Sequence, residues 1–309
     1  MIKIIVERPE QLTPAKRQEY AALLESKLSS RLFTGRNPMG IKSGELLLLG
    51  AYAEDRLIGC LSYSVYKGLF AADLLYISVL PEFRQQGIGL SLLNFLKEDL
   101  IQRNVHVCWA MYIKEDPFTS TLQDLFAKTG WGEPHHEIIR LFLDAWEYVS
   151  PYSSYPLPKG CEIFKWTDLT DDERATLKFK DQQRSFPEHV SPFSTKYAIE
   201  PLNSLGIRCE GEIIAWLITH RVNKETIRFS VFYVSPEYRR TACFLELGNI
   251  AIAAQHNSPI QWAMCEINFT QGHSTWRRFA MRELAPHAKK IENIYISTLN
   301  LKELDWDSV

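Results

Sequence analysis

The sequence predicts an α+β protein of two tandem domains, each with a mixed, mostly antiparallel central sheet flanked by helices. Two observations carry this prediction. Residues 79–84 read Val-Leu-Pro-Glu-Phe-Arg, and residues 234–239, 155 positions later, read Val-Ser-Pro-Glu-Tyr-Arg. In each half this motif ends a series of short apolar runs separated by turns, which is typical of an antiparallel meander. The runs are 45–53, 57–66 and 73–80, then 205–209, 212–219 and 226–235.

The repeat continues beyond this motif. Trp109-Ala110-Met111 recurs as Trp262-Ala263-Met264, and Phe126-Ala127 as Phe279-Ala280, both at an offset of 153. Matched blocks in the same order indicate a duplicated domain. We expect Trp109 and Trp262 to pack inside their domains as structural aromatics.

In the first half, the residues predict a strand at 2–7, a helix from Thr13 to about 28 with Pro14 in its first turn, and a polar loop over 34–44. After the meander, leucines at helical spacing follow Gly89, and 105–112 is a strand. A helix over 119–129 ends at Gly130, and a strand at 138–143 closes this half.

The second half repeats this order. Residues 150–160 contain three prolines and no helical or strand period, so they predict a linker between domains at 1–149 and 161–309. Residues 185–204 predict an irregular loop with short helical turns. The remaining expected elements are helices at 171–184, 242–256 and 273–284, and strands at 161–165, 260–267 and 291–297, besides the three apolar runs.

Composition bounds the class of protein. A chain of 309 residues with 46% hydrophobic and 23% charged residues fits a soluble protein of two domains. A net charge of −2 gives no field that favours nucleic acid or an anionic membrane. We expect no signal peptide and no membrane span. The six cysteines have no metal-ligand spacing, so we expect no metal. Five of them fall within or beside apolar runs, as buried free thiols would, which predicts a reducing cytoplasm.

The segment Arg84-Gln85-Gln86-Gly87-Ile88-Gly89 joins a strand to a helix. Its glycines allow backbone N–H groups to approach an anion, and the helix N-terminus adds unpaired donors and partial positive charge. Together these features predict a pyrophosphate cradle, to which Arg84 can add a charge-assisted hydrogen bond. No Lys-Ser/Thr pair follows and no Gly-x-Gly-x-x-Gly is present, which excludes a nucleotide P-loop and a Rossmann site. The second copy lacks both glycines.

This segment resembles the Gln/Arg-x-x-Gly-x-Gly/Ala motif of the GCN5-related N-acetyltransferase (GNAT) superfamily. Residues 125–131, Leu-Phe-Ala-Lys-Thr-Gly-Trp, resemble the family's Leu-Tyr-x-x-x-Gly-Phe helix, and the strand order of each half is similar to that fold. The resemblance implies a tandem GNAT protein. It implies that the backbone N–H groups of Gln85, Gln86, Gly87, Ile88, Gly89 and Leu90 bind the pyrophosphate of coenzyme A. Val79 would then present backbone groups to the pantetheine arm, with a slot for the acyl group where strands four and five splay apart beyond it.

Family members often place a carboxylate early in the fourth strand, and Asp73 lies six residues before Val79, on the same face by period two. Asp73 is therefore either the general base or a strand-start residue, and its counterpart Arg228 cannot be a base. The family's acid, a tyrosine, is replaced by Phe126. Tyr112 is either a substitute acid or an ordinary edge aromatic.

One further position follows from the resemblance. Thr119 matches a family asparagine near the pantetheine, or it caps the helix, or does both.

The resemblance implies an acyl-CoA-dependent N-acyltransferase. Its partners would be acyl-CoA, with an acetyl or longer fatty acyl group, and a primary amine of a small molecule or of a peptide Lys or ornithine side chain. The first domain would be catalytic and the second would serve recognition or structure. The alternative is a non-catalytic tandem protein that binds acyl-CoA or a protein partner, and release of free thiol from acetyl-CoA in the presence of amines distinguishes the two.

Overall fold

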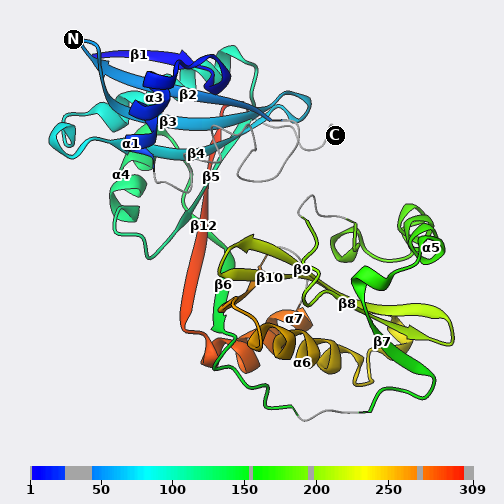
Figure 1. The fold of residues 1–309 in the computed structure, drawn as a ribbon. Coiled ribbons are helices and arrows are strands. Elements are labelled where there is room, and N and C mark those ends of the chain that lie inside the picture. The colour runs from blue at the N-terminus through cyan, green and yellow to red at the C-terminus, as the bar shows by residue number, and fades with distance from the viewer. Residues whose placement is uncertain (1, 25–43, 153–155, 194–197, 270–273, 303–309) are drawn as a thin grey trace. The chain divides into compact units, whose positions relative to one another are not determined.

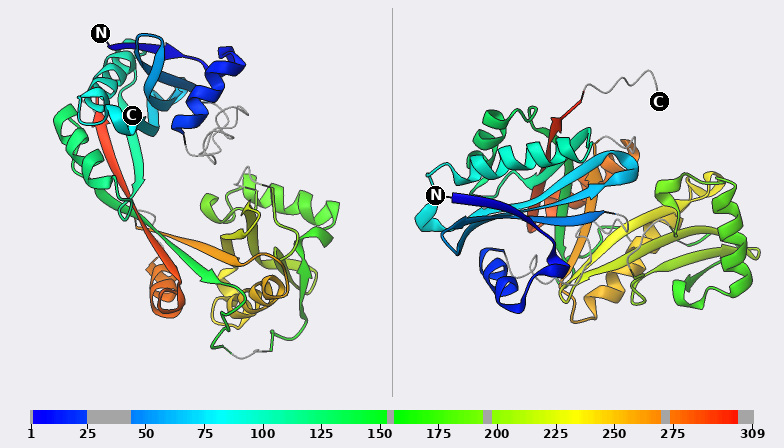
Figure 2. Two further views of the ribbon diagram at one scale, coloured as in Figure 1. Left: turned by 60° about the vertical axis from the view of Figure 1, so that its left-hand side comes forward. Right: turned by 90° about the horizontal axis from the view of Figure 1, so that it is seen from above.

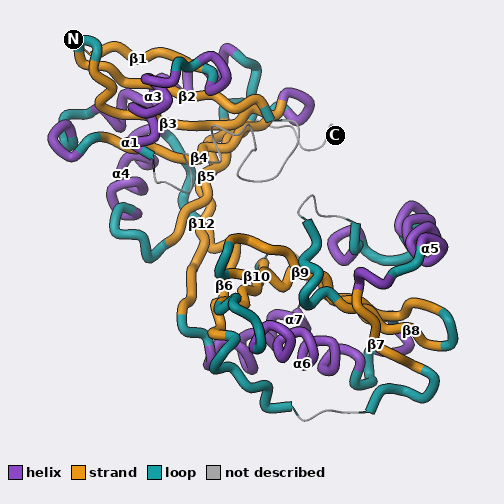
Figure 3. Tube along the Cα trace, in the orientation of Figure 1, coloured by secondary structure: helices purple, strands orange, loops and turns teal. Residues whose placement is uncertain are grey.

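The computed structural model describes residues 2–24, 44–152, 156–193, 198–269 and 274–302 (Figure 1). The chain forms two compact units. Unit 1 comprises residues 1–137 and 293–309, and unit 2 comprises residues 138–292. Each unit combines a sheet with helices, as the colours of Figure 3 show. The predicted α+β architecture with two copies of one fold is confirmed.

The sheet of unit 1 contains six strands in the order β1-β2-β3-β4-β5-β12. The β4–β5 pair is parallel, and the other described pairs in this sheet are antiparallel. The sheet is therefore mixed and mostly antiparallel, as the meander of apolar runs predicts. Its strands are β1 (Ile2–Glu7), β2 (Glu45–Ala53), β3 (Arg56–Tyr66), β4 (Ala71–Val79), β5 (Val107–Ile113) and β12 (Lys290–Asn300).

Among the described residues of this unit, the α-helices that pack on the sheet are α1 (Pro14–Leu23), α3 (Ile88–Gln102) and α4 (Thr119–Thr129). Helix α1 begins where the sequence predicts, because Thr13 accepts a hydrogen bond from the Lys16 amide and Pro14 occupies the first turn. Helix α4 ends at Gly130, whose φ of 84° is left-handed. The predicted loop 34–44, apart from Gly44, and the end of the predicted first helix lie outside the described residues.

The two faces of this sheet carry different helices. Leu92, Leu96 and Leu100 of α3 and Phe126 of α4 pack on one face, against residues such as Leu61. Helix α1 packs on the opposite face through Tyr20 and Leu23, against Leu48 and Tyr52. Each fully buried apolar side chain contributes about 1.5–3 kcal/mol, so both helical stripes are firmly attached. We call these the α3 face and the α1 face.

Unit 2 repeats this arrangement with strands in the order β7-β8-β9-β10-β11-β6 and a parallel β10–β11 pair. A short helical turn at Glu188–Val190 lies in the segment predicted as an irregular loop. The strands are β7 (Cys161–Lys165), β8 (Leu205–Cys209), β9 (Glu212–Asn223), β10 (Thr226–Val234), β11 (Trp262–Asn268) and β6 (His135–Asp144). The helices are α5 (Asp171–Gln182), α6 (Cys243–His256) and α7 (Ser274–Phe279), which continues into a π-helical turn at Ala280–Leu284.

The last strand of each unit comes from the other half of the sequence. Residues 138–144 of β6 pair with β11, and residues 294–300 of β12 pair with β5 (Figures 1 and 2). The strand at 138–143 therefore does not close the first unit, and the units do not follow the predicted division at 149 and 161. The physical reason is that ladder hydrogen bonds join backbone groups, so strand patterns do not specify which of two similar edges a strand joins.

The expectation of buried free thiols does not hold for Cys161 and Cys209. A disulfide joins Cys161 to Cys209, which lie directly opposite each other on β7 and β8. The sequence pattern does not predict this pairing, because 48 positions separate the two cysteines. The other four cysteines are buried and free, as expected. Within the described parts of the chain, no helix is long and apolar enough to cross a membrane.

Candidate functional site

The repeated motif builds the same turn in both units. The Arg84 side chain donates from Nε to the Val79 carbonyl at 3.0 Å, and Arg239 makes the matching bond to Val234 at 3.3 Å. Each proline begins a single 3-10 turn, at Pro81–Phe83 and Pro236–Tyr238. The shared residues therefore fix the exit from the fourth strand. Any functional difference lies in the residues that follow.

In unit 1, these following residues form an open cradle. Gln85 and Gly87 have left-handed φ angles of 60° and 79°, and Ile88 begins α3. A left-handed residue within a turn directs successive backbone N–H groups to one side and forms an anion-binding concavity. The first helical bond is donated by the Ser91 amide to the Gly87 carbonyl, so the amides of Ile88, Gly89 and Leu90 have no partner within the helix.

The two glycines have different tasks. A Cβ on Gly87 would meet no atom within 4 Å, so this position faces open space, and its left-handed φ favours glycine. A Cβ on Gly89 would lie 3.2 Å from Leu125 Cδ1, so that glycine allows α4 to pack closely on α3. Gln86 folds back and donates from its side chain to the Glu82 carbonyl at 3.2 Å. The loop is thus formed by backbone groups, and its binding of a pyrophosphate stays a prediction.

Arg84 is more constrained than expected. Besides its bond to Val79, its guanidinium lies over the Phe118 ring, 5.0 Å from the centroid. These contacts position the Arg84 side chain between the end of β4 and the start of α4. Its terminal Nη atoms can donate to a phosphate oxygen, while Nε donates to the Val79 carbonyl within the turn.

Strands β4 and β5 separate beside this cradle. Their parallel pairing covers Ala71–Leu74 and Val107–Ala110. The predicted splay is present, but it begins at Leu74, five residues before Val79. The rest of β4 therefore offers an edge that β5 does not occupy, where an extended pantetheine arm could receive backbone hydrogen bonds.

Asp73 lies on the opposite face to Val79, so the predicted common face is wrong. The pairing between β3 and β4 shifts by one residue at Leu75, which inserts a β-bulge. A bulge reverses the alternation of side chains beyond it. Val79 consequently packs on the α3 face, while Asp73 shares the α1 face with Ser64, its direct partner across the ladder.

The Asp73 carboxylate is half-buried and accepts a hydrogen bond of 2.8 Å from the Tyr66 hydroxyl. Burial raises the pKa of Asp73 above its ordinary value, although the Tyr66 bond acts in the other direction. A carboxylate with a raised pKa is a better proton acceptor, as a general base requires. Sequence pattern alone could not identify Tyr66 as a partner of Asp73, because this contact depends on the strand register.

Tyr112 lies beside Phe126, the residue that stands at the position of the family's tyrosine. Its ring is tilted against Phe126 at a centroid distance of 6.0 Å, and Phe126 is buried. The Tyr112 hydroxyl lies 3.0 Å from Ser297 Oγ and accepts a 3.3 Å hydrogen bond from the Gln123 side chain. Two polar groups thus orient a hydroxyl on the α3 face, just beyond the point where β5 leaves β4. Ser297 belongs to β12, 185 positions from Tyr112, so no local motif predicts this contact.

Thr119 is not the helix cap. The N-cap of α4 is Phe118, and the Thr119 hydroxyl donates instead to the Ile113 carbonyl at 2.7 Å. This bond joins the end of β5 to α4. The oxygen of the hydroxyl keeps lone pairs with which it can accept a hydrogen bond from a ligand.

The matching region of unit 2 is filled. The offset of 155 places Ala242 at the Gly87 position and Phe244 at the Gly89 position, and Ala242 has a φ of −73°. The Phe244 ring packs 4.2 Å from Phe232 and 5.1 Å from Phe279, between centroids. The Thr241 hydroxyl also accepts a hydrogen bond from the Cys243 amide. Aromatic rings therefore pack around Phe244, and the Thr241 hydroxyl engages the Cys243 amide, one of the backbone donors of this loop.

In unit 2, the position that corresponds to Asp73 is occupied by a cationic residue, Arg228. Arg228 forms an ion pair of 2.6 Å with Glu266, which also pairs with Arg140 at 2.8 Å. The neighbouring His220 is buried, and desolvation together with Arg228 lowers its pKa to about 4. Neither residue is suited to accept a proton from an ammonium at neutral pH, because Arg228 is charged and His220 is a weak base.

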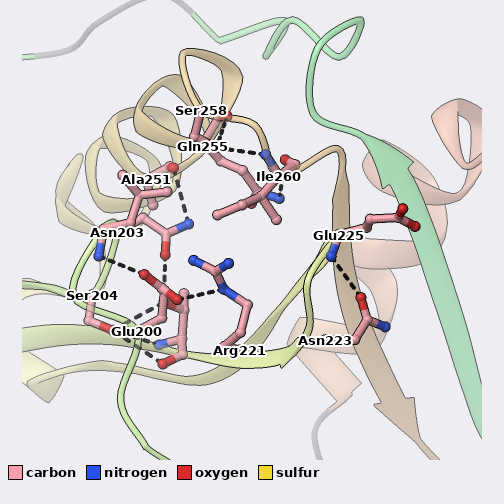
Figure 4. A network of polar contacts seen from close by, with 12 residues as sticks. Glu200, Asn203, Ser204, Arg221, Asn223, Glu225, Ala251, Gln255, Ser258 and Ile260 are labelled. Atoms are coloured by element: carbon pink, nitrogen blue, oxygen red, sulfur yellow. Dashed lines mark hydrogen bonds and ion pairs between the residues drawn. The ribbon is translucent and has the colours of Figure 1, made fainter. Parts of the chain in front are cut away.

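Unit 2 also contains an open hollow of about 450 Å³. Arg221 of β9 donates from Nε to the buried Glu200 carboxylate at 2.7 Å, and Gln255 bonds the Ile260 carbonyl (Figure 4). Glu200 also accepts a bond from the Leu202 amide. These contacts hold the loop before β8 against β9 and the end of α6 against the residues before β11.

Trp109 is not a core aromatic. It is 37% exposed and lies directly opposite Asp73 across the parallel ladder. The prediction failed because Trp109 and Trp262 are not structural counterparts: Val107 and Trp262 begin the equivalent ladders in the two units. Among the described residues, no group of three or more His, Cys, Asp or Glu side chains could hold a metal ion.

Comparisons with known proteins agree with this geometry. Residues 13–131 match the acetyltransferase (GNAT) family. No curated protein sequence matches the chain. Among solved structures, a tandem GNAT protein from the clavulanic acid biosynthesis pathway, without acetyl-CoA, is similar at a TM-score of 0.68 and 13% identity, over 99% of this chain and 100% of that one.

Two further structures are similar. A GCN5-related N-acetyltransferase from Sphaerobacter thermophilus has a TM-score of 0.60 at 15% identity, over 97% of this chain and 96% of that one. A glucosamine N-acetyltransferase region of a fungal multi-domain β-N-acetylglucosaminidase has a TM-score of 0.57 at 11% identity, over 97% and 38%. The first half of the chain therefore matches the acetyltransferase (GNAT) family over residues 13–131, and the fold over the whole length is similar to that of a tandem GNAT structure.

Proposed function

We propose that unit 1 is an acyl-CoA-dependent N-acyltransferase and that unit 2 binds no coenzyme A. The observation that carries this proposal is the contrast between the two copies. The cradle at Gly87 is open and lies beside a splayed strand pair, whereas in unit 2 Ala242 has no left-handed φ and the Phe244 ring packs against Phe232 and Phe279. The match of residues 13–131 to the acetyltransferase (GNAT) family supports acyl-CoA as the co-substrate.

In the proposed reaction, the amides of residues 85–90 hold the pyrophosphate and the free edge of β4 holds the pantetheine arm. Asp73 accepts a proton from the acceptor ammonium. The freed amine nitrogen forms a bond to the thioester carbonyl carbon, the C–S bond breaks, and the departing thiolate takes a proton from Tyr112 or from solvent. Positioning and carbonyl polarisation supply most of the acceleration, and a positioned base adds roughly 10²–10⁴-fold.

The proposed acceptor is a primary amine of a small molecule or of a peptide Lys or ornithine side chain, and the acyl group is acetyl or a longer fatty acyl. Unit 2 serves recognition or structure. We also propose a cytoplasmic location. In a reducing compartment the Cys161–Cys209 bond would open, so thiol counts of freshly isolated protein test this: six free thiols agree and four contradict it.

The second candidate is a protein that binds acyl-CoA without turnover. The observation in its favour is Phe126, which has no proton to give to the leaving thiolate. Thiol release distinguishes the two functions. The protein is mixed with acetyl-CoA, or with acyl-CoA of longer chain, and a panel of primary amines, and free coenzyme A is measured with a thiol reagent. Amine-dependent release agrees with the enzyme, and tight binding of acyl-CoA without release agrees with the binding protein.

A further inference from the structure

A row of polar and aromatic side chains crosses the α1 face of unit 1, and the inference drawn from it rests on the proposed function. Ser64 lies opposite Asp73 across the antiparallel ladder, and Asp73 lies opposite Trp109 across the parallel ladder. Directly opposed residues point to the same face, with their strands about 5 Å apart. Ser62 lies on this face too, opposite Tyr76.

The two serines are unusual in their surroundings. Both are completely buried, and neither Oγ atom has a hydrogen-bond partner among the described residues. An unpaired buried hydroxyl costs about 1–3 kcal/mol, and such groups are rare in folded proteins. The rest of β3 follows an apolar pattern, so two adjacent hydroxyls on one face suggest a polar ligand that supplies the missing partner.

Trp109 is unusual in the opposite way, because it is a large aromatic side chain that stays exposed. Its strand neighbours Cys108 and Ala110 are buried, yet the Trp109 side chain keeps solvent exposure on the α1 face. An accessible indole beside a carboxylate suits a cation, because the ring face attracts positive charge and the carboxylate neutralises it. Tyr66 fixes that carboxylate by its 2.8 Å hydrogen bond.

We propose that Trp109 is a specificity-determining residue for a primary alkylammonium acceptor. The ammonium binds between the Trp109 ring and the Asp73 carboxylate, on the side of the sheet away from the phosphate cradle. A second polar group of the same acceptor bonds the hydroxyls of Ser62 and Ser64. The amine thus loses its proton to Asp73 next to the point where β4 and β5 separate.

Two matched probes test this assignment: n-butylamine and 4-amino-1-butanol, with acetyl-CoA as donor. Trp109→Ala and Trp109→Leu should raise the KM for both amines by roughly 2- to 30-fold, the range of a cation–π contact, and Trp109→Phe should have a smaller effect. Ser62→Ala and Ser64→Ala should raise the KM for 4-amino-1-butanol and leave that for n-butylamine unchanged. The KM for acetyl-CoA should stay constant throughout.

Trp146→Phe, which alters a 45% exposed tryptophan in unit 2, is the control for general effects of tryptophan loss. Circular dichroism and acetyl-CoA affinity identify variants that fail to fold. Equal amine KM values in wild type and Trp109→Ala, or equal effects of leucine and phenylalanine, would overturn the inference. So would a wild type that transfers acetyl to other amines but to neither probe. The proposed function fails separately, if the wild type does not bind acetyl-CoA.

Discussion

Replacement of Gly87 by glutamate tests the phosphate cradle most directly. This change has two consequences, strain in the backbone at a left-handed residue and a negative charge in the cradle, and they can be considered one at a time. A Cβ at Gly87 meets no atom within 4 Å, so the new side chain is not excluded by the fold. The left-handed φ of 79° costs a residue with a Cβ about 1–2 kcal/mol, and the carboxylate enters the space meant for the pyrophosphate.

The electrostatic cost can be estimated. Two unit charges about 5 Å apart repel by roughly 1–3 kcal/mol for effective dielectric constants between about 80 and 20. A pyrophosphate carries two such charges near the loop, so the expected loss is at least about 2 kcal/mol. This corresponds to at least about a 30-fold increase in the Kd for coenzyme A.

Unit 2 offers a matched control. Gly211 has a φ of 85°, and a Cβ there also meets no atom within 4 Å. Gly211→Glu therefore introduces the same strain and charge in a turn far in sequence from the cradle. Calorimetric titration of coenzyme A should give weak or no binding for Gly87→Glu and wild-type binding for Gly211→Glu. An unchanged Kd in Gly87→Glu would refute the assignment of the cradle.

Three further outcomes are expected. Asp73→Asn should lower kcat by roughly 10²–10⁴-fold at unchanged acetyl-CoA affinity. This loss should shrink at high pH, where the amine is already neutral, and superimposable pH–rate profiles would contradict a base role. Titration should give one coenzyme A per chain, and a second tight site would contradict the filling of unit 2 by Phe244. Glu7→Gln should destabilise the fold at pH 7. Although burial raises the pKa of Glu7, hydrogen bonds from Lys16, Tyr20 and Tyr52 hold this pKa below its ordinary value. That stabilisation is lost as pH falls through the lowered pKa, so the difference in Tm should vanish toward low pH, and a constant difference would oppose this account.

Local pattern determined much of this protein. The motif at 79–84 and its copy specify a strand, a 3-10 turn and a helix start, because proline, the aromatic residue and arginine act through contacts within a few positions. The two glycines predicted which copy keeps an open cradle, since backbone conformation at Gly87 depends on the absence of its own Cβ. Composition and periodicity likewise predicted the α+β class and nearly all strands.

Only the tertiary structure decided the features that depend on distant partners. A single bulge at Leu75 moved Asp73 to the other face, since a one-residue shift reverses every side chain beyond it. The exchange of β6 and β12 altered the limits of both units. The backbone hydrogen bonds at a strand edge do not depend on residue type, so the sequence pattern does not specify which edge a strand joins. Tyr66 beside Asp73 and Ser297 beside Tyr112 became part of the site through strand register and strand pairing, which no local spacing encodes.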